Sequence, residues 1–153
     1  MFTEQEITKV QEDWGNGIVK IGSLKDDRAG CVKAALAHLD NLYAFDLGPV
    51  LFKPTKVADV QFRLTKASAL SYFVGGNENF PEDHGFAIHP YTAVRFENAG
   101  MILEEHRAIA MGNYYFTDCD GNDTKVEYTF GYLKDTNGNL KIDLHHSSIP
   151  YSK

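Results

Sequence analysis

The stretch Leu140–Tyr151 reads LKIDLHHSSIPY and follows a turn that contains Asn137-Gly138, a dipeptide typical of β-hairpins. Residues 140–149 are therefore predicted to form the last strand of a sheet. Pro150 ends the pairing, because proline has no N–H to donate to a neighbouring strand. The faces of this strand decide which of its polar side chains reach the interior.

Side chains on a strand alternate between its two faces. Counting from the apolar positions, one face carries Leu140, Ile142, Leu144, His146 and Ser148. This apolar face is predicted to be buried, so His146 and Ser148 are expected to point inward and His145 and Ser147 outward. An imidazole and a hydroxyl two residues apart on a buried face form a candidate chemical site. The alternative is a core histidine with a hydrogen-bonded serine and no catalytic role.

Length and composition fit one globular domain spanning residues 1–153, with 43% hydrophobic and 24% charged residues. The net charge of -6 and the absence of a Lys/Arg cluster make nucleic acid or an anionic membrane an unexpected partner. No apolar run approaches the roughly 20 residues of a membrane span, and the first residues lack the pattern of a signal peptide. The chain is expected to be soluble: cytoplasmic, or plastid or periplasmic if it was trimmed from a targeted precursor.

Three amphipathic helices are predicted in the first half of the chain. Each follows a side chain that can cap free backbone N–H groups, and these caps are Thr3 in a capping box with Glu6, Asp26 or Asp27, and Thr65. Gly15 and Gly17 interrupt the first helix, so a kink or close helix packing is expected there. Gly75-Gly76 ends the third helix.

The second half of the chain changes to a period of two. Strands are predicted at 91–98, 107–117, 125–134 and 140–149, with a further short strand at Val60–Arg63. An aromatic stripe in the third long strand is most simply core: Val126, Tyr128, Phe130 and Tyr132. Short turns between the long strands indicate an antiparallel meander. The predicted class is α+β, with N-terminal helices packed on a curved antiparallel sheet that encloses a cavity.

The six histidines do not form a recognisable metal site. A catalytic zinc site needs about three converging protein ligands. Adjacent His145 and His146 face opposite ways on a strand, and no HExxH motif is present. The sequence therefore predicts a site without metal or other cofactor, built from hydroxyls and one imidazole.

Four segments resemble a known family: Leu51–Lys56 (LFKPTK), Ala69–Gly76 (ALSYFVGG), Met111–Phe116 (MGNYYF) and His145–Tyr151 (HHSSIPY). They are similar to the iota class of carbonic anhydrases, which has a nuclear-transport-factor-2-like (SnoaL-like) cone fold. That class is related to the association domain of calcium/calmodulin-dependent kinase II. The resemblance implies reversible hydration of carbon dioxide to bicarbonate. Some members are described as metal-dependent, so zinc or manganese is the alternative to a metal-free site.

The family pattern implies catalytic and substrate-binding roles for Thr55, Tyr72, His146 and Ser148. In this hypothesis His146 accepts a proton from water, directly or through Ser148, while the hydroxyls stabilise the forming anion. The resemblance also implies a homodimer.

Two other functions also fit the sequence. An isomerase or another lyase on the same fold would need a buried carboxylate, and none clearly alternates inward on the four strands. A non-catalytic association module would use the outer face of the sheet for self-assembly.

Overall fold

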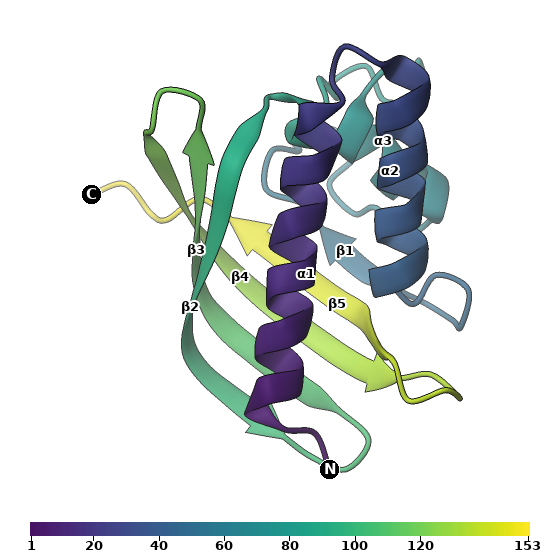
Figure 1. Ribbon diagram of the computed structural model, residues 1–153, viewed down its shortest axis with the longest axis vertical. Helices are drawn as coiled ribbons and strands as arrows, with labels where there is room; N and C mark the ends of the chain where they lie inside the picture. Colours follow the sequence, from purple (N-terminus) through teal and green to yellow (C-terminus); the bar gives the residue numbers. More distant parts are fainter.

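The computed structural model describes residues 1–153 and shows three helices against a curved five-stranded sheet (Figure 1). The helices are α1 (Glu4–Ser23), α2 (Arg28–Leu42) and α3 (Lys66–Val74), with a short 3-10 helix η1 (Phe86–Ile88). The strands are β1 (Leu51–Lys53), β2 (Tyr91–Leu103), β3 (Ala108–Asp118), β4 (Asp123–Lys134) and β5 (Leu140–Ser148). The predicted α+β class is confirmed. None of the helices is long and apolar enough to cross a membrane.

Local capping explains where the helices begin. The Thr3 hydroxyl accepts the Glu6 N–H at 3.2 Å, and the Glu6 carboxylate accepts the Thr3 N–H at 3.0 Å. Of the two candidates before α2, Asp27 is the cap. Thr65 caps α3, so all three predicted helices are confirmed.

The strands lie in the order β1-β5-β4-β3-β2. β2 to β5 form the predicted antiparallel meander, whereas β1 pairs with β5 in parallel, so the sheet is mixed. The predicted strand at Val60–Arg63 is wrong, because this segment is a loop. The N–H groups of Ala58 and Val60 are donated to the carboxylate of Glu82 instead of to a neighbouring strand.

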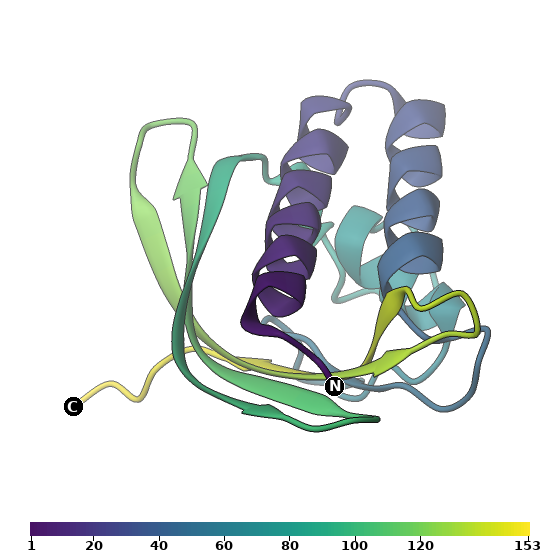
Figure 2. The same ribbon diagram turned by 60° about the horizontal axis from the view of Figure 1, so that its bottom comes forward.

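The curved sheet wraps around α1, with α2 beside it (Figure 2). The two helices approach closely at Gly17, where a Cβ atom would lie 2.1 Å from Nδ1 of His38. Close helix packing at this glycine was one of the two expected outcomes. The predicted aromatic stripe of β4 is buried in the core between the layers.

One extra residue interrupts the regular pairing of β4 with β5. Tyr132 pairs with Ile142, and Gly131 pairs with Leu144, so Asp143 has no partner of its own. An extra residue of this kind is a β-bulge, which shifts the alternation of all side chains that follow it.

The bulge determines which polar side chains of β5 reach the interior. Asp143 is held by Arg107, whose guanidinium donates to its two carboxylate oxygens at 3.0 and 2.5 Å. Beyond the bulge, His145 and Ser147 face the helices and are only 2% and 1% exposed. The same pair would face outward on an unbroken strand.

Candidate active site

An inner cavity lies where β3 and β5 meet α1, α3 and the loop after β1. Its apolar walls are Trp14, Phe52, Pro54, Phe73 and Phe86, and its polar groups belong to Thr55, Tyr72, Tyr114, His145 and Ser147. About 10 Å³ is open to the centre of a water-sized molecule, which is about the minimum space that holds one water. The cavity therefore suits a very small ligand.

Two of the four predicted site residues, Thr55 and Tyr72, line this cavity. The other two do not. His146 is exposed and Ser148 is half-buried, and both line a hollow on the outer face of the sheet. The prediction that they point inward is wrong, because the bulge at Asp143 shifts the alternation by one residue.

Sequence reasoning missed three members of the cluster, namely Tyr114, His145 and Ser147. The HHSS segment places an imidazole and a hydroxyl two residues apart on either face, so a period of two cannot choose between the pairs. Tyr114 comes from β3 and lies in Met111–Phe116, one of the segments that resemble the family, but nothing in that segment singles it out. Only the tertiary structure brings it to the others.

A chain of hydrogen bonds runs through the cavity. Ser147 Oγ lies 2.7 Å from Thr55 Oγ1 and 2.5 Å from Tyr114 Oη. Tyr114 Oη also lies 3.1 Å from Nε2 of His145. Three hydroxyls and one imidazole are thus linked without an intervening charge.

The chain continues behind the imidazole into the core. Nδ1 of His145 lies 2.8 Å from Tyr43 Oη, and this oxygen accepts a hydrogen bond from Nε1 of Trp14 at 2.9 Å. Because an indole N–H can only donate, the Tyr43 hydroxyl is left to donate to Nδ1. The opposite arrangement would leave the Tyr43 O–H without a partner, which costs roughly 1–3 kcal/mol for a buried group.

This end sets the direction of the bonds from His145 to Ser147. A neutral imidazole that accepts at Nδ1 carries its proton on Nε2 and donates it to Tyr114. Tyr114 then donates to Ser147. The Ser147 hydroxyl has two acceptors within reach, Oγ1 of Thr55 at 2.7 Å and the Glu127 carbonyl oxygen at 3.3 Å. The shorter contact is to Thr55, whose own hydrogen is then left for a ligand. Tyr72 behaves in the same way, because its oxygen accepts the Lys56 N–H at 3.1 Å. Two O–H donors are therefore available in the cavity.

Burial keeps the whole cluster uncharged. The His145 ring is stacked between Phe52 and Phe130, with centroids 4.8 and 4.0 Å away. Burial lowers the pKa of His145 well below its usual value, so the ring is neutral at neutral pH. Burial also raises the pKa of Tyr72 and of Tyr114, so both phenols keep their protons.

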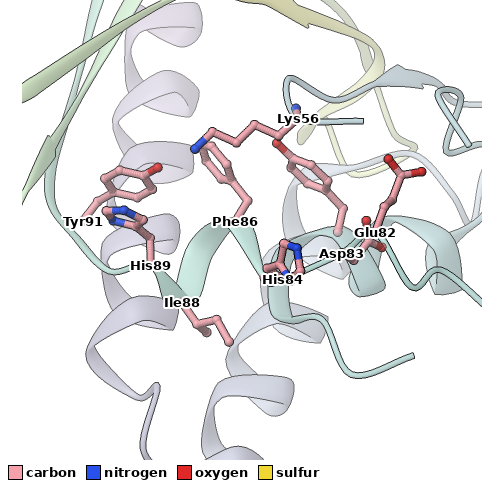
Figure 3. Close-up of a pocket in the computed structure, with 10 residues that line it drawn as sticks. Lys56, Glu82, Asp83, His84, Phe86, Ile88, His89 and Tyr91 are labelled. Atoms are coloured by element: carbon pink, nitrogen blue, oxygen red, sulfur yellow. Dashed lines mark hydrogen bonds between the residues drawn. The ribbon is translucent and has the colours of Figure 1, made fainter. Parts of the chain in front are cut away.

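A wider outer pocket of about 340 Å³ adjoins the inner cavity (Figure 3). Tyr72 and Phe86 belong to the lining of both spaces. Lys56, His89 and Tyr91 lie around the outer pocket on the side of Phe86 (Figure 3).

The donor set of the inner cavity is unlike a metal centre. It contains one imidazole and no carboxylate or thiol. Nowhere in the structure do three or more His, Cys, Asp or Glu side chains come together in a way that could hold a metal ion. The buried carboxylate that an isomerase of this fold would use is also missing from the cavity.

The family described as metal-independent carbonic anhydrase matches residues 5–149. The chain belongs to this family. A metal-independent carbonic anhydrase from Nostoc sp. is 42% identical over 155 residues, which cover 99% of this chain and 76% of that relative. The crystal structure of a cyanobacterial iota-carbonic anhydrase complexed with bicarbonate matches with a TM-score of 0.96 at 41% identity, covering 99% of this chain and 94% of that one. The predicted family is thus confirmed, and carbonic anhydrases are lyases.

More distant structures share the fold alone. A putative calcium/calmodulin-dependent protein kinase II association domain from Xanthomonas campestris has a TM-score of 0.63 at 22% identity, covering 100% of this chain and 91% of that one. A nuclear-transport-factor-2-like protein from Pseudomonas putida has a TM-score of 0.56 at 17% identity, covering 97% and 87%. The predicted cone fold is confirmed, and the description of the family as metal-independent agrees with a carbonic anhydrase that needs no cofactor.

Proposed function

We propose that this carbonic anhydrase hydrates carbon dioxide in the inner cavity, with no metal ion. Carbon dioxide and water give bicarbonate and a proton, and the reaction runs in both directions. The observation that carries the proposal is the pair of O–H donors in the cavity: Thr55, at the end of the chain of hydrogen bonds, and Tyr72, whose oxygen accepts the Lys56 N–H. The bicarbonate bound to the cyanobacterial relative supports the same ligand here.

The lining of the inner cavity suits both the neutral substrate and the anionic product, and the adjoining outer pocket gives the room that a space for one water lacks. Apolar rings such as Phe52, Phe73 and Phe86 accept carbon dioxide, which has no net charge. As the water oxygen attacks carbon, negative charge develops on the carbon dioxide oxygens. Preorganised donors aimed at developing charge are an effective source of catalysis in a site that excludes water. Thr55 and Tyr72 are proposed as these donors.

Ser147, Tyr114 and His145 are proposed to position the donors. Ser147 and His145 take the place of Ser148 and His146 in the hypothesis drawn from the sequence, because they are the serine and the histidine that reach the cavity. Since the pKa of His145 is well below its usual value, the ring serves as a neutral donor to Tyr114 and not as a store for the released proton.

The test is the rate of carbon dioxide hydration, followed by the fall in pH, on protein that has been stripped with a chelator and checked by elemental analysis. We expect the stripped protein to retain its activity. If it is inactive and zinc or manganese restores the rate, the metal-free mechanism is wrong while the enzyme class stands. If it hydrates no carbon dioxide with or without metal, the proposed function is wrong.

We further infer that residues 1–153 act as one domain and assemble as a homodimer through the outer face of the sheet. One sheet and one continuous core of buried residues support the single domain. The outer face carries Met111, whose surface is 56% exposed, beside the hollow that His146 and Ser148 line. Light scattering at several concentrations tests the dimer, and a monomer at every concentration would contradict it.

A further inference from the structure

Each hydration event releases one proton, and the inner cluster has no place to keep it. Both nitrogens of His145 are engaged by tyrosine hydroxyls, and burial opposes a charge on the ring. Behind it the chain of hydrogen bonds ends at the indole of Trp14, which cannot accept a proton. The hydroxyl hydrogens are also directed toward the cavity and not away from it. The proton therefore has to leave on the side of Thr55 and Tyr72.

That side adjoins the outer pocket, where both carboxylates already have partners. Asp83 accepts two hydrogen bonds from the Arg63 guanidinium, each 2.7 Å long, and one from Ser71 at 2.5 Å. Glu82 accepts the backbone N–H groups of residues 58–60 and lies 3.8 Å from the same guanidinium. These two carboxylates hold residues 58–63 in place, and they are poor proton carriers while they are engaged in these hydrogen bonds.

Two imidazoles of the outer pocket remain free. Nδ1 of His89 lies 3.3 Å from the carbonyl oxygen of Pro90 and must donate to it, which leaves Nε2 of the neutral ring as an acceptor. The His89 ring stacks on Tyr91, with centroids 4.9 Å apart and planes at 13°. His84 lines the same pocket and makes no side-chain hydrogen bond (Figure 3). Imidazole is the side chain that exchanges protons most readily near neutral pH.

We propose that the outer pocket is the proton exit of the enzyme, with His89 as the main acceptor and His84 as a second one. This inference rests on the proposed function. As the bond between the water oxygen and the carbon of carbon dioxide forms, an O–H bond of that water breaks. The proton passes through pocket water to Nε2 of His89, and from there to a buffer base in solvent. The other charged or titratable groups around the pocket are Lys56, Tyr72, Glu82, Asp83 and Tyr91.

The test compares the single variant His89→Gln and the double variant His84→Gln/His89→Gln with the wild type. Hydration is measured in dilute buffer that contains no imidazole. Glutamine keeps a hydrogen-bonding side chain but cannot carry a proton at these pH values. His106→Gln is the matched control, because His106 is an exposed histidine in the turn between β2 and β3 and does not line the pocket.

We expect the double variant to be about tenfold slower, which is less than the roughly hundredfold or larger effect of general acid–base groups, because solvent water replaces part of the lost function. Added imidazole should restore its rate in a concentration-dependent way and should change the wild type and His106→Gln little. A double variant as fast as the wild type in dilute buffer, or a slow one that imidazole does not rescue, would overturn the proton exit. If the wild type itself were inactive, the proposed function would fail first, so the two failures are distinguishable.

Discussion

The hydroxyl of Tyr43 lies 2.8 Å from Nδ1 of His145 and donates a hydrogen bond to it. This contact sets the tautomer of the imidazole, because the Tyr43 oxygen is itself occupied by the N–H of Trp14. A residue far from the reacting atoms thereby sets the direction in which the hydroxyls of the cavity donate. The site depends on the core behind it as much as on the residues that touch the ligand.

Tyr43→Phe should therefore harm both stability and activity. The change leaves two buried groups, Nε1 of Trp14 and Nδ1 of His145, without a partner. We expect the free energy of unfolding to fall by roughly 1–3 kcal/mol for each buried group left without a partner. We also expect slower hydration, because the tautomer of His145 is no longer fixed. Denaturant unfolding and the hydration assay measure the two effects. Tyr151→Phe is the control, since Tyr151 is 89% exposed, and an equal loss in both variants would contradict this role for Tyr43.

The stability of the protein should fall in acid because of its buried histidines. Burial lowers the pKa of His38 to about 4, and Nε2 of this ring has no hydrogen-bond partner. The unfolded chain takes up a proton on this residue near its ordinary pKa of about 6.5, so the unfolded state binds more protons between the two values. Stability is then lost as pH falls from about 6.5 toward about 4, by up to about 1.4 kcal/mol per pH unit for one group.

The measurement is the free energy of unfolding of the wild type and of His38→Leu at several pH values in this window. The variant should show a slope smaller by about one proton, with the remaining acid sensitivity coming mainly from His145. If the free energy of unfolding depends on pH in the same way in both proteins, His38 is not a buried group that stays neutral in this window.

The ion pair of Arg63 with Asp83 should contribute strongly to the stability of the protein beside the active site. Both side chains are fully buried, and their closest atoms are 2.7 Å apart. Removing one partner of a buried pair typically costs about 3–5 kcal/mol, and Glu82, 3.8 Å from the Arg63 guanidinium, compensates only part of the charge that is left. Asp83→Asn should therefore destabilise the protein by several kcal/mol in denaturant unfolding.

The exposed pair of Lys9 with Asp13 on α1 provides the control for that prediction. Exposed pairs of this kind contribute little to stability because water and salt screen them, so Asp13→Asn should change the free energy of unfolding little. Comparable losses in Asp13→Asn and Asp83→Asn would be incompatible with the special place given to the buried pair.

Features that depend on neighbouring residues could be predicted from the sequence. Thr3 and Thr65 cap helices through groups three residues away, and Asn137-Gly138 lies in the turn that precedes β5. The long strands follow from a period of two. Val60 and its neighbours were misassigned because a distant carboxylate, that of Glu82, takes up their N–H groups.

The side of the sheet toward which the active-site residues of β5 point could not be predicted in this way. The bulge at Asp143 arises from the pairing of two strands, and no local residue pattern marks it. Because the alternation shifts by one residue at the bulge, His145 and Ser147 face the cavity where the sequence predicts His146 and Ser148. Thr55 and Tyr72 came from the family resemblance and do lie in the cavity, which their local sequence did not suggest.

The most direct test of the active site compares Ser147→Ala with Ser148→Ala in metal-stripped protein. Each change removes one serine hydroxyl, and the two serines are adjacent in the sequence. Only Ser147 lies in the chain of hydrogen bonds that ends at Thr55. We predict that Ser147→Ala lowers the rate of carbon dioxide hydration by roughly tenfold to a hundredfold, which is less than the roughly hundredfold to thousandfold loss on removing a donor, because the Thr55 and Tyr72 hydroxyls remain. Ser148→Ala should stay close to the wild type. A loss of activity in Ser148→Ala with Ser147→Ala unaffected would contradict the placement of the active site.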